Sequence, residues 1–403
     1  MKYIFKLLIL LVLVTSCDNE FETIHTYSKQ YNLSKDYPIF LDVSNILTNI
    51  QVKPSVNPEA TFKIASTDKY LFIGEMMKGI HVYEKTDAGH ADPLCFIECK
   101  HLKAFDLTDD HLYCNNFVDL LVIDVKNPAQ ARILHREENY FNKYSNPDWN
   151  MNTINASESG NRLYEIALKT VSLSGIETEL DPAPDFSEYD KLYGQIIVDA
   201  IPDTIKVDKP YVGFAGTPGM MYTFGYNSLA FCTFDHSGFH QAQSSILFPN
   251  NVSSPPSKLH YKDNMLYTSG GSFTTYYDFN LNRQATLYDY SNSKIDVSYM
   301  ESQKTFWFLS KSGIYGGQTI DGHTFTASIN IPGIETLTCI GDHIITLGSR
   351  LEVYSVPLLE VVKKYPDISG SCMLKEGDTL IIAGKKGLSF YDISNLKDIK
   401  LIP

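Results

Sequence analysis

The chain has 403 residues, a formal net charge of −13 from 34 Lys and Arg against 47 Asp and Glu, and 43% hydrophobic residues. An acidic surface repels phosphate backbones and anionic lipid headgroups, which argues against nucleic acid as a partner. The 26 Tyr residues suit outer strands and hydrated binding faces, but composition alone indicates no site.

The N-terminus has the pattern of an export signal. Lys2 and Lys6 form a basic start, Leu7 to Val14 is an unbroken apolar run, and small residues stand directly before Cys17. The run is too short to span a bilayer as a helix, so residues 1–16 are predicted to be a signal peptide that is removed. A Cys at the cleavage point resembles the bacterial lipoprotein signal, in which the thiol is acylated. The alternative is an ordinary secretion signal whose cleavage site contains a Cys by chance.

Residues 17–37 are predicted to be a lipid-anchored flexible spacer, because the segment is polar and carries acids directly after Cys17. Lipid chains on Cys17 would anchor the protein to a membrane without a spanning segment. The folded domain is predicted over residues 38–403.

A strand pattern recurs along this domain: an apolar run that ends in Asp, then a turn and a second apolar run. Its clearest copies are Leu120–Asp124 and Leu388–Asp392. Self-similarity at a spacing of roughly 35 to 45 residues, with strand chemistry, indicates a β-propeller. Asp, Asn and Gly, which tolerate tight hairpin turns, precede most of the second strands. The predicted second strands are Tyr70 to Gly74, Leu112 to Asn115, Met221 to Gly225, Met265 to Ser269, Thr305 to Leu309, Ile344 to Gly348 and Leu380 to Gly384. The predicted fold is therefore all-β, a β-propeller with seven blades.

Two stretches depart from the repeat. Residues 138–210, rich in Asn, Ser, Asp and Pro, are predicted to be a long insertion between the second and third blades, with a short helical or β piece around Asn161 to Leu173. A loop that long is usually functional or disordered. Residues 39–53 are predicted to lend a strand to the last blade, so that the chain ends meet, because an unpaired sheet edge is a liability. Packing of this stretch across one face is the alternative.

Six cysteines follow Cys17, and most lie inside apolar strand runs, where they would pack as small hydrophobes. Free buried thiols are therefore favoured over disulfides. Cys95 and Cys99 have no second pair at metal-ligand spacing, so no zinc site is predicted. The six are Cys95, Cys99, Cys114, Cys232, Cys339 and Cys372.

The segments from Leu120 to Ala129 and from Gly387 to Asn395 resemble the LVIVD repeat, a propeller repeat of exported bacterial proteins, and Tyr70 to Tyr83 looks like the opening blade of repeat-bearing lipoproteins of the Bacteroidetes. The resemblance is good over residues 60–136 and 370–402 and loose between them. It departs at Gly316-Gly317 and at Ser355, where an Asp turn is expected. It implies an extracytoplasmic propeller on a lipid anchor, without an established reaction from which catalytic residues could be carried over.

The acidic residues directly after Cys17 resemble signals that send lipoproteins of the Bacteroidetes to the cell surface. A position that faces the periplasm is the alternative.

Four Asp residues recur at the ends of predicted strands. Asp124, Asp235, Asp278 and Asp392 end strands before Asn, Ser or Pro, so they are predicted to cap turns by accepting backbone N–H bonds. The segment Asp278–Asn282 opens like a calcium loop, but Arg283 replaces the turn Gly and Asp289 the bidentate Glu, so calcium is not predicted.

His236 and His240 lack a helix face to align them and are interpreted as turn residues rather than metal ligands. Gly213 to Gly219 lacks the spacing and Lys of a phosphate-binding loop, and the chain has no Gly-x-Ser-x-Gly elbow. We therefore predict no catalytic residue, metal or cofactor.

Two functions stay open at this point. The missing motifs favour a non-catalytic, envelope-anchored binding or scaffolding module that presents one face and the 138–210 insertion to a protein or glycan partner. The alternative is a surface polysaccharide hydrolase or lyase that uses carboxylates at one mouth of the propeller channel.

Overall fold

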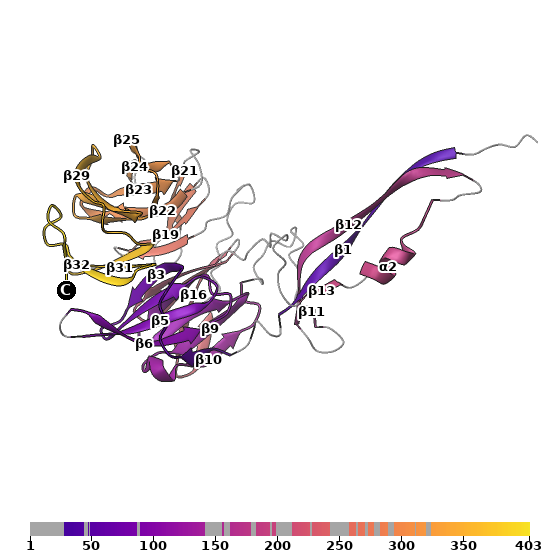
Figure 1. The fold of residues 1–403 in the computed structure, drawn as a ribbon, viewed down its shortest axis with the longest axis horizontal. Coiled ribbons are helices and arrows are strands. Elements are labelled where there is room, and N and C mark those ends of the chain that lie inside the picture. The colour runs from indigo at the N-terminus through magenta and orange to yellow at the C-terminus, as the bar shows by residue number, and fades with distance from the viewer. Residues whose placement is uncertain are drawn as a thin grey trace, which may run out of the picture. The chain divides into compact units, whose positions relative to one another are not determined.

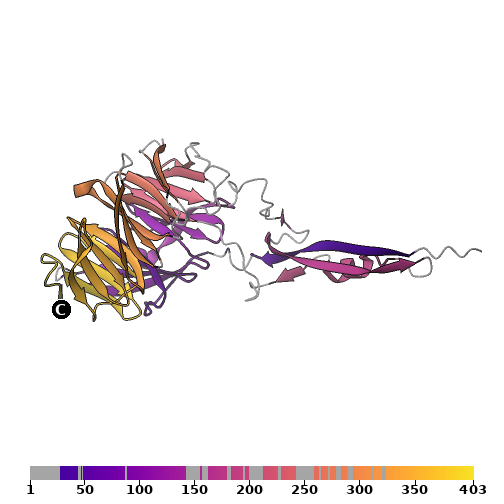
Figure 2. The ribbon, with the colours of Figure 1, turned by 90° about the horizontal axis from the view of Figure 1, so that it is seen from above.

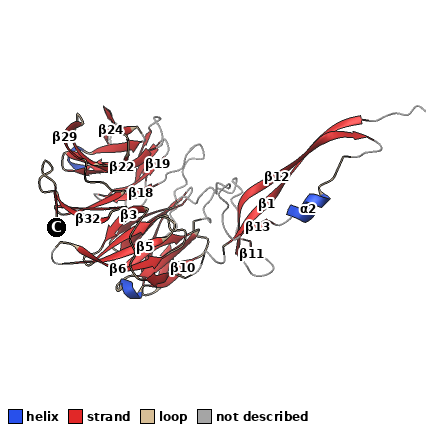
Figure 3. Cartoon of the chain, viewed as in Figure 1, coloured by secondary structure: helices blue, strands red, loops and turns tan. Residues whose placement is uncertain are grey.

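The computed structural model describes residues 28–43, 47, 49–86, 89–141, 155–156, 162–178, 183–193, 196–198, 212–225, 228–241, 258–262, 265–270, 273–277, 283–288, 294–310, 312–319 and 324–403. The chain divides into two compact units. The first, here called the arm, comprises residues 1–40 and 167–197, and the second, the propeller, comprises residues 41–166 and 198–403. Strands make up nearly all regular structure in both units (Figure 3).

The propeller contains seven antiparallel sheets among its described residues, here called blades 1 to 7 in chain order. Blade 1 comprises β3 (Thr61–Ser66), β4 (Tyr70–Glu75), β5 (Gly79–Lys85) and β6 (Ala91–Glu98). Blade 2 comprises β7 (Phe105–Thr108), β8 (His111–Asn116), β9 (Asp119–Asp124) and, after the short helix η1 (Pro128–Gln130), β10 (Arg132–Glu137). Blade 3 comprises β14 (Gly213–Thr217), β15 (Met220–Gly225), β16 (Ser228–Asp235) and β17 (Gly238–Gln241).

The other four blades follow the same order (Figure 1). Blade 4 comprises β18 (Lys258–Lys262), β19 (Met265–Gly270), β20 (Phe273–Tyr277) and β21 (Arg283–Tyr288). Blade 5 comprises β22 (Lys294–Met300), η2 (Glu301–Gln303), β23 (Thr305–Ser310), β24 (Gly313–Thr319) and β25 (Thr324–Asn330). Blade 6 comprises β26 (Ile334–Ile340), β27 (His343–Gly348), β28 (Leu351–Ser355) and β29 (Glu360–Tyr365). Blade 7 comprises β30 (Cys372–Glu376), β31 (Thr379–Gly384), β32 (Gly387–Asp392) and β33 (Lys400–Leu401).

The seven second strands predicted from the sequence coincide with β4, β8, β15, β19, β23, β27 and β31. The middle strands of a blade are covered on both faces by neighbouring blades, which is why they read as continuous apolar runs rather than as alternating patterns. In β9, every residue from Asp119 to Ile123 is buried, and only Asp124 at the turn is partly exposed.

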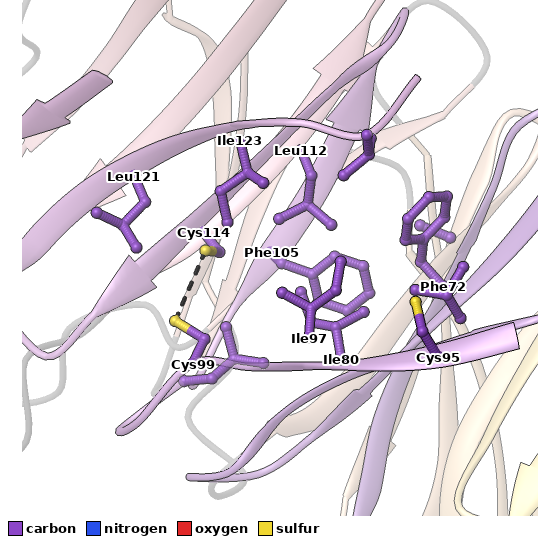
Figure 4. Close-up of a cluster of buried hydrophobic side chains, with 14 residues drawn as sticks. Phe72, Ile80, Cys95, Ile97, Cys99, Phe105, Leu112, Cys114, Leu121 and Ile123 are labelled. Atoms are coloured by element: carbon purple, nitrogen blue, oxygen red, sulfur yellow. Dashed lines mark hydrogen bonds between the residues drawn. The ribbon is translucent and has the colours of Figure 1, made fainter. Parts of the chain in front are cut away.

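The hydrophobic core lies between blades, with one buried cluster at each junction of the ring. At the junction of blades 1 and 2, Phe72, Ile80 and Ile97 pack against Phe105 and Leu112 (Figure 4). At the junction of blades 7 and 1, Ile381 and Phe390 of blade 7 pack with Ile64 and Leu71 of blade 1. Strand β3 contacts β30, so the ring closes between the first and last blades.

The prediction that residues 39–53 lend a strand to the last blade is wrong. Strand β2 (Gln51–Lys53) pairs with β6, with Val52 opposite Ile97, and so adds a fifth strand to the outer edge of blade 1 rather than to blade 7. Blade 7 has its own fourth strand, β33, which pairs with Tyr391 and Asp392 of β32. Face-to-face packing of complete blades, rather than a shared strand, closes the ring.

The six cysteines from Cys95 onward are free and buried, as the sequence predicts. Two of them meet between blades 1 and 2, where the Cys99 and Cys114 sulfur atoms are 3.9 Å apart (Figure 4). Burial raises the pKa of Cys95 to about 11 and raises that of Cys232 further.

The strands of the arm belong to a four-stranded sheet in the order β11-β12-β1-β13. The sheet comprises β1 (Ser28–Asp42), β12 (Arg162–Thr178), β13 (Ile196–Val198) and the two-residue β11 (Asn155–Ala156), which falls in residues 41–166. The arm also contains the helix α2 (Ser187–Tyr193). Strands β1 and β12 run side by side as a long twisted ribbon (Figures 1 and 2). The structure thus differs from the predicted flexible spacer, because residues 28–37 form part of β1, whose partner strand lies far along the chain in the insertion.

Candidate protein-interaction face of the propeller

One face of the propeller is formed by two kinds of connection. These are the turns between the second and third strands of a blade and the segments that lead from one blade to the next. The two kinds are hydrogen-bonded to each other: the Met77 N–H donates to the Leu102 carbonyl at 2.7 Å, and the Phe141 N–H donates to the Val118 carbonyl at 3.0 Å. We call this face the loop face. The predicted insertion, residues 138–210, begins on it, since Phe141 lies four residues after the end of β10 and bonds the turn between β8 and β9.

A buried ionic cluster supports the loop face at blade 1. Glu75, 2% exposed, ends β4, and its Oε2 lies 2.6 Å from Nε2 of the fully buried His81. Its Oε1 lies 2.7 Å from Nζ of Lys78, which also pairs with Glu59 at 2.7 Å. Burial alone would raise the pKa of Glu75, but the hydrogen bonds from Lys78 and His81 outweigh it and lower the pKa.

Blade 2 has a comparable cluster at the same level. Asp119, which starts β9 and is fully buried, accepts a 2.8 Å hydrogen bond from Nη1 of Arg136 and a 2.8 Å bond from the Asn139 N–H. The same Arg136 nitrogen donates to Oδ1 of Asn116 at 3.0 Å. These bonds tie the turn between β8 and β9 to the segment that follows β10.

Blade 6 repeats the arrangement with different residues. Glu352 in β28 is fully buried, and its Oε1 lies 2.8 Å from Nε of Arg350 and 3.0 Å from Nζ of Lys364. Tyr354 donates a hydrogen bond to the other carboxylate oxygen. Burial alone would raise the pKa of Glu352, yet the three hydrogen bonds together lower it.

The three buried acids, Glu75, Asp119 and Glu352, are 2% exposed or less, so none of them presents a carboxylate to a substrate.

Acidic residues on the first strands of the blades form bonds to neighbouring blades. Asp106 in β7 pairs with Lys63 of blade 1 at 2.8 Å and accepts a hydrogen bond from the Gly216 N–H of blade 3 at 3.0 Å. Asp296 in β22 accepts from Thr336 of blade 6 at 2.7 Å. These carboxylates join neighbouring blades.

The loop face at blades 1 and 2 carries four non-glycine residues in the left-handed region: Met77, His101, Phe117 and Asn139, with φ of 67°, 58°, 59° and 56°. Such conformations cost about 1–3 kcal/mol each and persist only where surrounding contacts fix them. The His101 N–H donates to the Met77 carbonyl at 3.0 Å, and the His101 ring packs edge-on against Phe117 at 5.5 Å. Burial, with Lys103 and Lys100 nearby, lowers the pKa of His101. These loops therefore present a fixed shape.

The exposed side chains of the same face combine apolar and basic groups. Met76, in the turn between β4 and β5, is 40% exposed although it is a large hydrophobic residue. Exposed lysines also lie on this face, on the segment between blades 1 and 2 and in the turn between β31 and β32 of blade 7. They are Lys100, Lys385 and Lys386. Lys78, in the turn between β4 and β5, is instead paired with Glu75 and Glu59.

The predicted turn-capping role of the repeated Asp residues is confirmed at three positions. Asp124, Asp235 and Asp392 each end a third strand and accept a hydrogen bond from the backbone N–H two residues later, at 3.1, 2.7 and 2.9 Å. The hydroxyl groups of Ser237 and Ser394, together with these backbone N–H groups, lower the pKa of Asp235 and Asp392. Asp278, and with it the segment Asp278–Asn282, lies outside the described residues.

The other predicted positions lie apart from the loop-face clusters. His240 Nε2 lies 2.7 Å from the Ser237 hydroxyl and 3.3 Å from Asp235, all on the exposed turn between β16 and β17. In the part of the chain that the structure describes, no group of three or more His, Cys, Asp or Glu side chains is arranged to hold a metal ion. Gly213 to Gly219 forms β14 and the turn after it. Cys17, the predicted lipidation site, lies outside the described residues.

Sequence reasoning missed the buried acids Glu75, Asp119 and Glu352. A signal was present, because each charged residue lies within or beside an apolar strand run, and a charge there requires a partner. The partners Arg136 and Lys364 come from the fourth strand of the same blade, so the sequence alone does not pair them.

No family model matches the chain, and no curated protein matches it. Its fold is similar to that of solved structures. A chain in the crystal structure of the mitotic checkpoint complex matches with a TM-score of 0.51 at 10% sequence identity, over 85% of this chain and 90% of that chain. The WD40 repeats of RRP9 match with a TM-score of 0.51 at 9% identity, over 86% of this chain and 91% of that chain. The chain is an all-β propeller, as its sequence predicts.

None of the described helices is both long enough and apolar enough to span a membrane.

Proposed function

We propose that this protein is an envelope-anchored β-propeller, a lipoprotein of the LVIVD-repeat type of the Bacteroidetes, that acts as a non-catalytic binding module for a protein partner. Residues 1–16 would be removed and Cys17 acylated, which places the mature protein at the outer membrane, exposed at the cell surface. The loop face of blades 7, 1 and 2 would be the contact surface.

The exposed Met76 and the exposed lysines of the loop face carry this proposal. Exposed apolar groups within a polar surround are typical of protein interaction sites, and Met is enriched at such sites. The buried clusters and the hydrogen-bonded loops hold this surface in one shape, which reduces the entropy lost on binding. The lysines favour a partner with an acidic surface, because complementary charge raises the association rate.

The arm would be the part of the chain attached to the anchor. Strand β1 starts at Ser28, the eleventh residue after Cys17, so a lipid on Cys17 would join the chain to the membrane through the arm. A strand of 15 residues extends over about 50 Å. In place of the flexible spacer expected from the sequence, a paired ribbon would then separate the anchor from the folded unit.

A crosslinking pull-down from intact cells tests the proposal, with the full-length protein compared with a Cys17→Ala form retained in the periplasm. We expect one envelope protein to be recovered in stoichiometric amount with the anchored form and not with Cys17→Ala. Recovery of polysaccharide without protein would overturn the proposed partner class, and turnover of that polysaccharide would overturn the non-catalytic function.

A further inference from the structure

Strand β12 has an open edge. One side of β12 pairs with β1, and the other side pairs with β11 only through Leu163 and Arg162. Among the described residues, no further strand covers that second side from residue 164 to 178. An open strand edge offers unpaired backbone N–H and C=O groups to another strand.

The arm also exposes apolar side chains at an unusual density. The described residues hold ten exposed large hydrophobic side chains, and five of them belong to the arm, although it is much the smaller unit. On β12 itself, Leu168 is 56% exposed and Ile176 is 64% exposed. The five are Leu33, Leu168, Ile176, Leu192 and Ile197. This exposure indicates a surface that another protein covers.

We propose that the open edge of β12 pairs with β12 of a second copy of this chain, antiparallel and centred on Leu173. A two-fold axis at Leu173 would join the two ribbons into one continuous sheet, in the order β1-β12 followed by β12-β1 of the second copy. The interaction goes beyond the proposed capture of a partner and does not depend on it.

Charge complementarity selects the register. Residues 168–178 contain one basic side chain, Lys169, and one acidic side chain, Glu177. Each is four positions from Leu173, so pairing centred there places Lys169 opposite Glu177 of the second copy, twice by symmetry. Opposite charges on directly facing residues stabilise a strand pair.

The remaining pairs in this register also match. Ser172 faces Ser174 of the second copy, where the hydroxyl groups can bond, and Thr170 faces the exposed Ile176 as a β-branched pair. Within the chain, Gly175 is covered by the Tyr31 ring of β1, whose hydroxyl would lie 2.6 Å from a Cβ atom at that position. Val171 faces Gly175 of the second copy, so the apolar side chain of Val171 lies opposite a residue that has no side chain.

Lys169 is already held in position inside the arm. Its Nζ lies 3.9 Å from the ring centroid of Tyr193 at the end of α2, and Asp190 of the same helix bonds Lys35 and Tyr37 of β1. An ammonium group has three N–H donors, so contact with the face of one ring leaves donors for a carboxylate of the second copy.

Reciprocal charge variants test the pairing in the full-length chain with Cys17→Ala, by sedimentation velocity. Lys169→Glu and Glu177→Lys each place like charges opposite each other twice, and we expect each to raise the dimer dissociation constant by roughly tenfold. An equimolar mixture of the two variants restores both attractive pairs and should form a heterodimer with wild-type affinity. Damage inside the arm would not be rescued by mixing, so single variants that stay monomeric when mixed would overturn the proposal.

Cysteine substitutions give an independent test. In this register Leu173 faces itself across about 4.5–5.5 Å between Cα atoms, within reach of a disulfide. Oxidation of Leu173→Cys should therefore give a covalent dimer. Ser174→Cys is the matched control, because Ser174 faces Ser172 and not itself. Equal crosslinking of both variants, or a wild-type chain that is monomeric at every concentration, would contradict the pairing.

Discussion

Lys85 and Glu376 join the first and last blades of the propeller. Nζ of Lys85, at the end of β5, lies 2.9 and 2.8 Å from the two carboxylate oxygens of Glu376, at the end of β30. The Ser66 hydroxyl of β3 also donates to this carboxylate. One acidic side chain of the last blade therefore binds two elements of the first, at the junction where the sequence predicts a shared strand.

We expect Glu376→Ala to lower the free energy of unfolding by about 1–2 kcal/mol, because it leaves Lys85 and Ser66 without their shared acceptor. Glu98→Ala is the matched control, since Glu98 pairs with Lys53 at 2.7 Å within blade 1 and does not join blades. It should cost about 0.5 kcal/mol. Urea denaturation measures both, and equal losses would show that the closing junction has no special role.

The buried acids predict how stability depends on pH. The pKa values of Glu75 and Glu352 are lower in the folded chain than the ordinary value of 4.5. Their stabilising contribution is therefore complete above pH 4.5 and is lost as the pH falls through the folded pKa values. Thermal unfolding should show a Tm that falls steeply below that pH. Glu352→Gln removes one of the two groups, so its Tm should be lower at neutral pH and should fall less on acidification; a parallel curve would refute this role.

Two glycines should respond differently to the same substitution. A Cβ at Gly216 would lie 1.8 Å from the Leu107 backbone carbonyl, so Gly216→Ala forces blades 2 and 3 apart and should cost about 3 kcal/mol or more. Gly175→Ala meets only the far end of the Tyr31 side chain, its hydroxyl and the adjoining ring carbons, which can turn aside, and should cost about 1 kcal/mol or less. Chemical denaturation distinguishes them, and a tolerated Gly216→Ala would contradict the close approach of these blades.

The six cysteines from Cys95 onward should be unreactive in the folded protein. All are buried, and burial raises the pKa of Cys95 to about 11, so few thiolates form at neutral pH. In a Cys17→Ala chain, iodoacetamide should label none of them under native conditions and all six in urea. Rapid native labelling, or fewer than six thiols after unfolding without reductant, would contradict free buried thiols.

The sequence predicts the architecture well, because each blade is built from local signals. Apolar runs, the Asp caps at Asp124 and Asp392, and the spacing between them are set by residues close together in the chain. Closure of the ring is not local, since Glu376 and Lys85 are 291 positions apart. Residues 39–53 have ordinary strand character, which fits the edge of blade 1 as well as that of blade 7.

The arm and the loop face were harder to predict for the same reason. Strand β1 is polar along much of its length, and only its pairing with β12 makes it a strand. Asp119 reads as an ordinary strand residue until Arg136 is placed beside it. The lysines of the loop face are scattered over the sequence, and the fold gathers them on blades 1 and 7 and the segment after blade 1.

Capture of the partner by two charge-matched variants tests the central claim most directly. Lys100, Lys385 and Lys386 lie on the loop face, while Lys69, Lys126 and Lys397 are equally exposed on the opposite face of blades 1, 2 and 7. Each set is changed to Glu, so both variants carry the same net charge. We predict that the loop-face variant captures at least tenfold less of the protein recovered by the crosslinking pull-down, while the opposite-face variant captures as much as the wild type. Equal capture by both variants, or a loss confined to the opposite face, would contradict a binding site on the loop face.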